Sequence, residues 1–177
     1  KVTISFICIL AIAFFFTAQI GHLTFAQELT SEVGAGWRIE SAAWSPDGTK
    51  IAIGGGSNTQ GCGLADKSVY AIQILDTTST KIIQTLAGHT CTVVSIAWSH
   101  DGSKIVTGSE DGTTRVWDTA GDQSINIVQA NSFGSKSSLS WNSSDSQYAA
   151  IDSASRVVEI RDATNGQLLN TNSFTRE

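Results

Sequence analysis

The sequence predicts an all-β chain built from about three repeated units of four short antiparallel strands, preceded by an N-terminal export segment. Two patterns indicate this fold class: a tryptophan-centred motif occurs three times at a regular interval, and apolar residues within it alternate with small ones. Composition agrees, because the 177 residues include 16 glycines and one proline, with 41% apolar and 15% charged residues. Such a chain can bury a core and make many turns.

The first 26 residues carry a single charge, that of Lys1, and an uninterrupted run of 11 apolar residues from Phe6 to Phe16. This run has the length of the hydrophobic region of a secretory signal and is well short of the roughly 20 residues that span a bilayer. We predict a signal peptide over residues 1–26, cleaved after Ala26, and therefore a secreted, periplasmic or cell-surface protein. The alternative is an uncleaved signal anchor, the only feature through which we expect contact with a membrane.

Residues 27–177 consist largely of three copies of one unit. The tryptophans that mark the copies, Trp44, Trp98 and Trp141, are 54 and 43 residues apart. An aspartate closes each copy at intervals of 42 and 44 residues, so the first copy carries an insertion of about 11 residues. The expected boundaries of the copies are approximately 36–87, 88–130 and 131–171.

In the middle copy, polar turns divide the sequence into four predicted strands. Val94, Ile96 and Trp98 alternate with small residues, and Asp101-Gly102 then predicts a tight turn, since glycine accepts a positive φ. Further strands are expected around residues 105–106, 114–117 and 125–128. Four short antiparallel strands per repeat make one blade of a β-propeller.

The middle copy resembles a complete WD repeat, the blade of the WD-repeat β-propeller family, because Gly88-His89 is followed at the right distance by Trp117-Asp118. The first and third copies lack the Gly-His pair and close with Leu75-Asp76 and Arg161-Asp162. The resemblance implies a structural hydrogen-bonded set of His89, Asp111, Trp117 and a strand hydroxyl, either Thr107 or Ser109.

A Ser-His-Asp catalytic triad is the competing interpretation of these residue types. We prefer the structural one, because the same set recurs in this blade pattern without chemistry and the chain has no Gly-x-Ser-x-Gly elbow. Gly54-Gly55-Gly56 lacks the Gly-Lys-Ser/Thr of a phosphate-binding loop, and the three histidines lack zinc-ligand spacing. We therefore expect no catalytic, cofactor or metal residues, and the net charge of −5 argues against nucleic acid as a partner.

Two cysteines, Cys62 and Cys91, lie outside the predicted signal peptide. Cys62 falls in the loop between the second and third strands of the first blade, and Cys91 in the loop that leads into the second blade. Alternate connections of an up-and-down blade share one end, so both loops are expected there. An oxidising compartment would favour a disulfide, which would stabilise the fold by roughly 3–4 kcal/mol. Two unrelated thiols are the alternative.

The insertion in the first blade is the best candidate for contact with a partner, because insertions in repeat proteins fall on loops and often on the binding face. The candidate contact residues in it are Ser57, Asn58, Gln60, Asp66 and Lys67. We expect a non-enzymatic scaffold that binds a protein or peptide partner. The alternative is an accessory region of a larger enzyme or signalling protein whose catalytic domain lies outside this chain.

Three blades are fewer than the four to eight that close a propeller. We expect either that further blades follow in the natural chain or that copies associate to complete a ring.

Overall fold

The structure is a computed structural model, and it describes residues 37–57, 62–63, 67–121, 124–129, 137–152 and 157–173. The predicted signal peptide therefore lies outside the described residues. Among the described residues there is no helix long and apolar enough to cross a membrane.

Within the described residues, twelve strands form three antiparallel sheets of four strands, each in sequence order, as the sequence predicted. The first sheet contains β1 (Trp37–Trp44), β2 (Lys50–Ser57), β3 (Ile72–Asp76) and β4 (Ile82–Leu86), with the short 3-10 helix η1 (Lys67–Tyr70) before β3. The second contains β5 (Val93–Trp98), β6 (Lys104–Ser109), β7 (Thr113–Asp118) and β8 (Ser124–Gln129). The third contains β9 (Ser137–Trp141), β10 (Gln147–Asp152), β11 (Val157–Asp162) and β12 (Leu168–Ser173).

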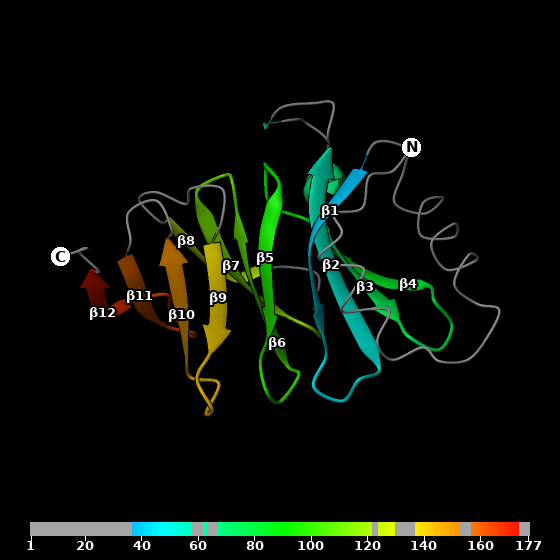
Figure 1. The fold of residues 1–177 in the computed structure, drawn as a ribbon. Coiled ribbons are helices and arrows are strands. Elements are labelled where there is room, and N and C mark those ends of the chain that lie inside the picture. Colours follow the sequence, from blue (N-terminus) through cyan, green and yellow to red (C-terminus); the bar gives the residue numbers. More distant parts are fainter. Residues whose placement is uncertain are drawn as a thin grey trace.

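The three sheets stand side by side as successive propeller blades (Figure 1). The first strand of each blade contacts its neighbour, with β5 against β1 and β2, and β9 against β5 and β6. The fourth strands β4 and β12 lie toward opposite ends of the row (Figure 1). The backbones of neighbouring blades therefore approach most closely at their first and second strands.

The first turn of each blade follows from the residue that adopts a left-handed backbone. Gly48 and Gly102 have φ values of 69° and 72°, and each donates its N–H to the carbonyl of the serine three residues earlier. In the third blade Asp145 takes the same position with a φ of 53°. The three turns are therefore alike although one has lost its glycine.

A β-bulge in the first strand changes the alternation that the sequence predicted. The register shifts between Val93 and Ser95 in β5, and at the corresponding place between Ile39 and Ser41 in β1. The bulge buries Val93 completely and leaves Val94 half-buried. The prediction that Val94 shares one regular face with the later apolar residues was therefore wrong, because a bulge adds a residue to one strand only.

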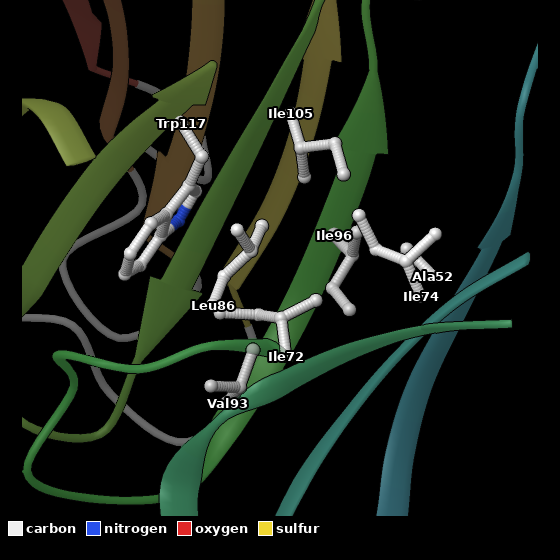
Figure 2. Packing of buried hydrophobic residues seen from close by; sticks show 8 residues of the cluster. All are labelled: Ala52, Ile72, Ile74, Leu86, Val93, Ile96, Ile105 and Trp117. Atoms are coloured by element: carbon white, nitrogen blue, oxygen red, sulfur yellow. The ribbon is translucent and has the colours of Figure 1, made fainter. Parts of the chain in front are cut away.

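The apolar core lies between the blades. Between the first two blades, a cluster takes half of its side chains from each sheet (Figure 2): Ala52, Ile72, Ile74, Leu86, Val93, Ile96, Ile105 and Trp117. A second cluster lies between the second and third blades and includes Val106, Val116, Leu139, Trp141 and Tyr148. Both faces of the middle blade are thus covered.

A tryptophan hydrogen bond crosses each of the two interfaces at the same place. The indole Nε1 of Trp98 donates to the carbonyl of Ala43 in the first blade, at 3.0 Å. The indole Nε1 of Trp141 donates to the carbonyl of Ala97 in the second, also at 3.0 Å. The repeated tryptophan therefore ties each blade to the preceding one.

Candidate functional site

A buried chain of hydrogen bonds joins four side chains of the middle blade. His89 lies between β4 and β5 and is fully buried. Its Nδ1 is 2.8 Å from Oδ2 of Asp111, and its Nε2 is 2.8 Å from the hydroxyl of Thr107. The indole Nε1 of Trp117 donates to the same hydroxyl at 2.8 Å. The structure thus brings together His89, Thr107, Asp111 and Trp117.

These contacts assign the direction of each hydrogen bond. The Asp111 carboxylate can only accept, so Nδ1 of His89 carries the proton and donates it. In the neutral ring Nε2 is then an acceptor, and the hydroxyl of Thr107 donates to it while accepting from Trp117. Burial of the imidazole lowers the pKa of His89, outweighing the hydrogen bond and charge of Asp111, so the ring is neutral near pH 7. With this neutral tautomer, every polar side-chain atom of these four residues has a hydrogen-bond partner.

Asp111 is the centre of a denser set of contacts. Burial raises the pKa of this carboxyl, but hydrogen bonds from His89, Thr113 and the backbone N–H of Thr90 outweigh burial and hold the pKa well below its usual range. Oδ1 accepts from both the N–H and the hydroxyl of Thr113, at 2.9 and 2.6 Å. The carboxylate therefore fixes the turn before β7 as well as the histidine.

Thr113 was missed by the sequence analysis. Its hydroxyl lies 3.2 Å from Nδ1 of His89 in addition to its bond to Asp111. The signal that could have found it is its position two residues after an aspartate in an Asp-Gly turn, where a threonine side chain folds back on the carboxylate. Ser109, the alternative partner for the histidine, instead donates to the carbonyl of Cys91 at 2.9 Å.

The geometry excludes a nucleophilic role for this network. The hydroxyl of Thr107 belongs to a residue with no exposed surface, and it is already held by Trp117 on one side and His89 on the other. A nucleophile must reach a substrate carbon, and a fully buried hydroxyl cannot. The network instead ties the segment before β5 to strands β6 and β7.

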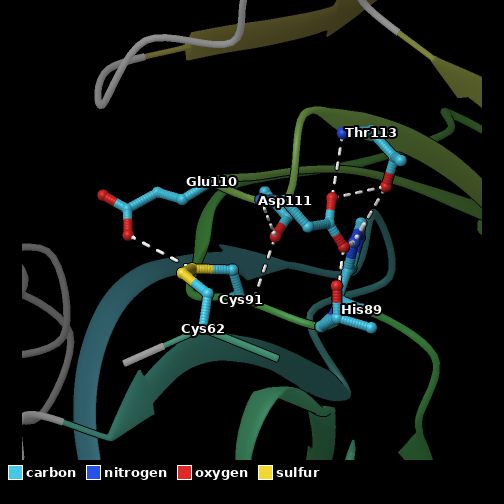
Figure 3. Close-up of a disulfide and its surroundings, with 8 residues drawn as sticks. Cys62, His89, Cys91, Glu110, Asp111 and Thr113 are labelled. Carbon is cyan, nitrogen blue, oxygen red and sulfur yellow. Dashed lines mark hydrogen bonds and ion pairs between the residues drawn. A yellow bond between two sulfur atoms is a disulfide. The ribbon is translucent and has the colours of Figure 1, made fainter. Parts of the chain in front are cut away.

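The two cysteines lie side by side in the structure, next to Glu110 (Figure 3). Their Cα atoms are 4.5 Å apart, and their sulfurs are paired in the structure. Cys91 is buried and Cys62 is exposed. The N–H of Gly63 donates to the carbonyl of Thr90 at 2.7 Å, so the insertion is joined to the segment that carries His89.

Of the predicted partner-contacting residues, Ser57 ends β2 and Lys67 begins η1. Asn58, Gln60 and Asp66 lie outside the described residues. Between these two residues the structure describes Cys62 and Gly63, which lie where the two cysteines meet.

A further contact, between the second and third blades, comes from residues that the sequence analysis did not single out. The carboxylate of Asp145 accepts from the N–H groups of His100 and Asp101 at 2.8 and 2.9 Å, and from Nδ1 of His100 at 2.9 Å. Burial raises the pKa of Asp145, but these hydrogen bonds outweigh burial and lower it. The turn of the third blade is thereby joined to that of the second.

Comparison with known proteins agrees with this architecture. The family model described as WD domain, G-beta repeat matches residues 80–118. The chain is similar to COMPASS component SWD3 of Saccharomyces cerevisiae, with 28% identity over 134 residues, which are 76% of this chain and 38% of that protein. It is also similar to Retinoblastoma-binding-like protein E of Dictyostelium discoideum, with 35% identity over 79 residues, 45% of this chain and 13% of that protein.

A third relative is Vegetative incompatibility protein HET-E-1 of Podospora anserina, 38% identical over 52 residues, which are 29% of this chain and 4% of that protein. The chain spans less than two fifths of the length of each of these three relatives. The matched residues 80–118 contain His89, Thr107, Asp111 and Trp117, and the flanking sheets repeat the same four-stranded build. The chain therefore contains a WD repeat within residues 80–118, between two sheets of the same four-stranded build.

Proposed function

We propose that this chain is a scaffold that binds other proteins through the loops at the cysteine-bearing end of its blades. The observation that carries the proposal is that the polar side chains of the WD motif are all engaged inside the blade. His89 and Thr107 are fully buried, and Asp111 bonds to three neighbouring residues. These buried groups hold the loops in place, and the loops then present their own side chains to a partner.

The relatives support this role. SWD3 is named as a component of COMPASS, and Retinoblastoma-binding-like protein E is named for binding a protein. Within this chain, the insertion between β2 and β3 distinguishes the first blade from the other two, and insertions in repeat proteins often lie on the binding face. We therefore assign partner contact to residues 57–67.

The experiment compares proteins cross-linked to the tagged full chain and to two variants, with identification by mass spectrometry. In the loop variant four residues are changed to alanine: Asn58, Gln60, Asp66 and Lys67. The control variant carries Thr78→Ala and Lys81→Ala, two exposed residues in the turn at the opposite end of the same blade. We expect the loop variant to lose partners that the control retains. Identical partner sets for all three chains would contradict the assignment.

We further propose that the protein acts after export. The apolar run of residues 6–16 and the pairing of Cys62 with Cys91 support this location. Mass spectrometry of the protein from its source should give a chain that begins at Gln27. Recovery of a cytosolic chain that still contains residues 1–26 would contradict export without affecting the scaffold proposal.

A further inference from the structure

Three side chains with metal-binding atoms meet where the insertion of the first blade touches the start of the second (Figure 3). They are Cys62, Cys91 and Glu110, and their ligand atoms all lie within 4.8 Å of one another. Oε2 of Glu110 is 3.7 Å from Sγ of Cys91. Among the described residues, the Glu110 carboxylate makes no other hydrogen bond or ion pair, so it is not needed by the buried network.

We propose that, when the two cysteines are reduced, Cys62, Cys91 and Glu110 bind one Zn²⁺ ion. Two thiolates and one carboxylate form a donor set typical of zinc, and a water molecule would complete four-coordination. The proposal goes beyond the scaffold function, because it concerns a metal and not a protein partner.

The geometry on the second blade already suits such an ion. With Zn–S near 2.3 Å and Zn–O near 2.1 Å, sulfur and oxygen at two corners of a tetrahedron are about 3.6 Å apart. The observed 3.7 Å between Cys91 and Glu110 matches this edge. The backbone holds both residues in place, because Ser109 donates to the carbonyl of Cys91 and the N–H of Glu110 donates to the carbonyl of Thr92, each at 2.9 Å.

The third ligand has room to adjust. Two sulfurs on one zinc ion are about 3.8 Å apart, so Cys62 must move away from Cys91 after reduction. Cys62 is exposed and is followed by Gly63, whose φ is 86°. A Cβ placed on Gly63 would meet nothing within 4 Å, so there is open space at the side-chain position next to Cys62.

The disulfide and the metal exclude each other, because both use the same two sulfurs. Reduction of the disulfide takes two electrons and two protons and yields two thiols. A thiol reductant supplies both and is oxidised to a disulfide, whereas a phosphine supplies the electrons and becomes its oxide, with the oxygen and the two protons coming from water. Zinc then displaces the two thiol protons, so binding strengthens as pH rises. Either state joins the insertion to the start of the second blade, one through a covalent bond and the other through the ion.

The test uses the full chain with Cys8→Ser, so that Cys62 and Cys91 are the only cysteines. The protein is reduced with a phosphine, freed of metal and titrated with Zn²⁺ against a chromophoric chelator. Co²⁺ serves as a second probe, because thiolate ligands give it a charge-transfer band in the near ultraviolet. The variants are Glu110→Gln, the double substitution Cys62→Ser with Cys91→Ser, and Glu40→Gln as a matched carboxylate control outside the cluster.

We expect one equivalent of Zn²⁺ to bind to the reduced chain, and none to the oxidised chain or the double serine variant. Loss of an outer-shell partner typically costs 10–100-fold in metal affinity, so loss of the ligand in Glu110→Gln should cost at least roughly tenfold, with Glu40→Gln unchanged. The site is refuted if the reduced chain binds Zn²⁺ no better than the double serine variant. It is also refuted if Glu110→Gln binds as tightly as Glu40→Gln. Circular dichroism of each variant establishes that it is folded.

Discussion

Replacement of Asp111 by alanine removes the acceptor for four hydrogen bonds at once. Its carboxylate accepts from Nδ1 of His89 at 2.8 Å and from the N–H of Thr90 at 2.9 Å. It also accepts from the N–H and the hydroxyl of Thr113, at 2.9 and 2.6 Å. Hydrogen bonds to a charged group contribute about 1.5–3 kcal/mol each, but the loop donors near the surface regain water when the carboxylate is lost. The Nδ1–H of His89 stays buried and keeps only the longer contact of 3.2 Å to the hydroxyl of Thr113.

We therefore expect Asp111→Ala to lower the free energy of unfolding by about 3–5 kcal/mol. A buried donor left without its acceptor costs about 1–3 kcal/mol, and the three other lost hydrogen bonds add the remainder at about 0.5–1.5 kcal/mol each, less where water replaces the carboxylate. The assay is equilibrium unfolding in urea followed by tryptophan fluorescence, since Trp117 in the same network is fully buried. With a urea dependence near 2 kcal/mol/M, the midpoint should fall by about 2 M. Asp111→Asn, which keeps one acceptor oxygen, should give a smaller loss and remains measurable if the alanine variant does not fold.

Asp101→Ala is the matched control. This carboxylate also accepts several hydrogen bonds, of which those from the N–H of Ser103 and the hydroxyl of Ser99 contribute most to lowering its pKa to about 2. Asp101 is exposed in its turn, so water replaces those bonds and the expected loss is about 1 kcal/mol or less. Equal losses for Asp111→Ala and Asp101→Ala would refute the reasoning that burial sets the magnitude.

Three further predictions concern the backbone, the buried histidine and the cysteine pair. A Cβ on Gly55 would overlap the carbonyl oxygen of Arg38, so Gly55→Ala should cost at least about 3 kcal/mol in urea unfolding, whereas Gly121→Ala, which meets nothing within 4 Å, should cost little. Because the pKa of His89 is lower in the folded than in the unfolded chain, its contribution to stability is complete above about pH 6.5 and is lost as pH falls. Calorimetry from pH 7 downward should show this decline, and a His89→Gln variant with an unchanged profile would contradict it. Cys62→Ser should lower stability by roughly 3–4 kcal/mol under oxidising conditions and leave it unchanged in reductant; equal losses in both would argue against a disulfide.

The third blade shows how a repeat that departs from the sequence pattern can still form the same turn. Asp145 stands where the other copies have glycine, and from the sequence this position reads as a departure from the pattern. In the structure Asp145 adopts the same left-handed backbone, with φ 53°, and its carboxylate binds His100 and Asp101 of the neighbouring blade. The substitution replaces backbone freedom with contacts between two blades, and only the position of the second blade reveals this.

The sequence by itself determined the number of repeats, the four strands of each and the aspartate-glycine turns, because these depend on residues close together in the chain. Alternation of apolar residues selects a strand, and glycine selects a left-handed turn. The family resemblance also led to the buried set around His89. It could not choose between Thr107 and Ser109, which lie two residues apart on one strand.

Tertiary structure decided the contacts that join one blade to another. The bond from Trp98 to the carbonyl of Ala43 and the bond from the N–H of His100 to the carboxylate of Asp145 have no signature in a single copy of the repeat. Each depends on how far one sheet is rotated and shifted against its neighbour. That placement is fixed by the packing of side chains from two blades into one core, where every volume depends on residues far away in the sequence.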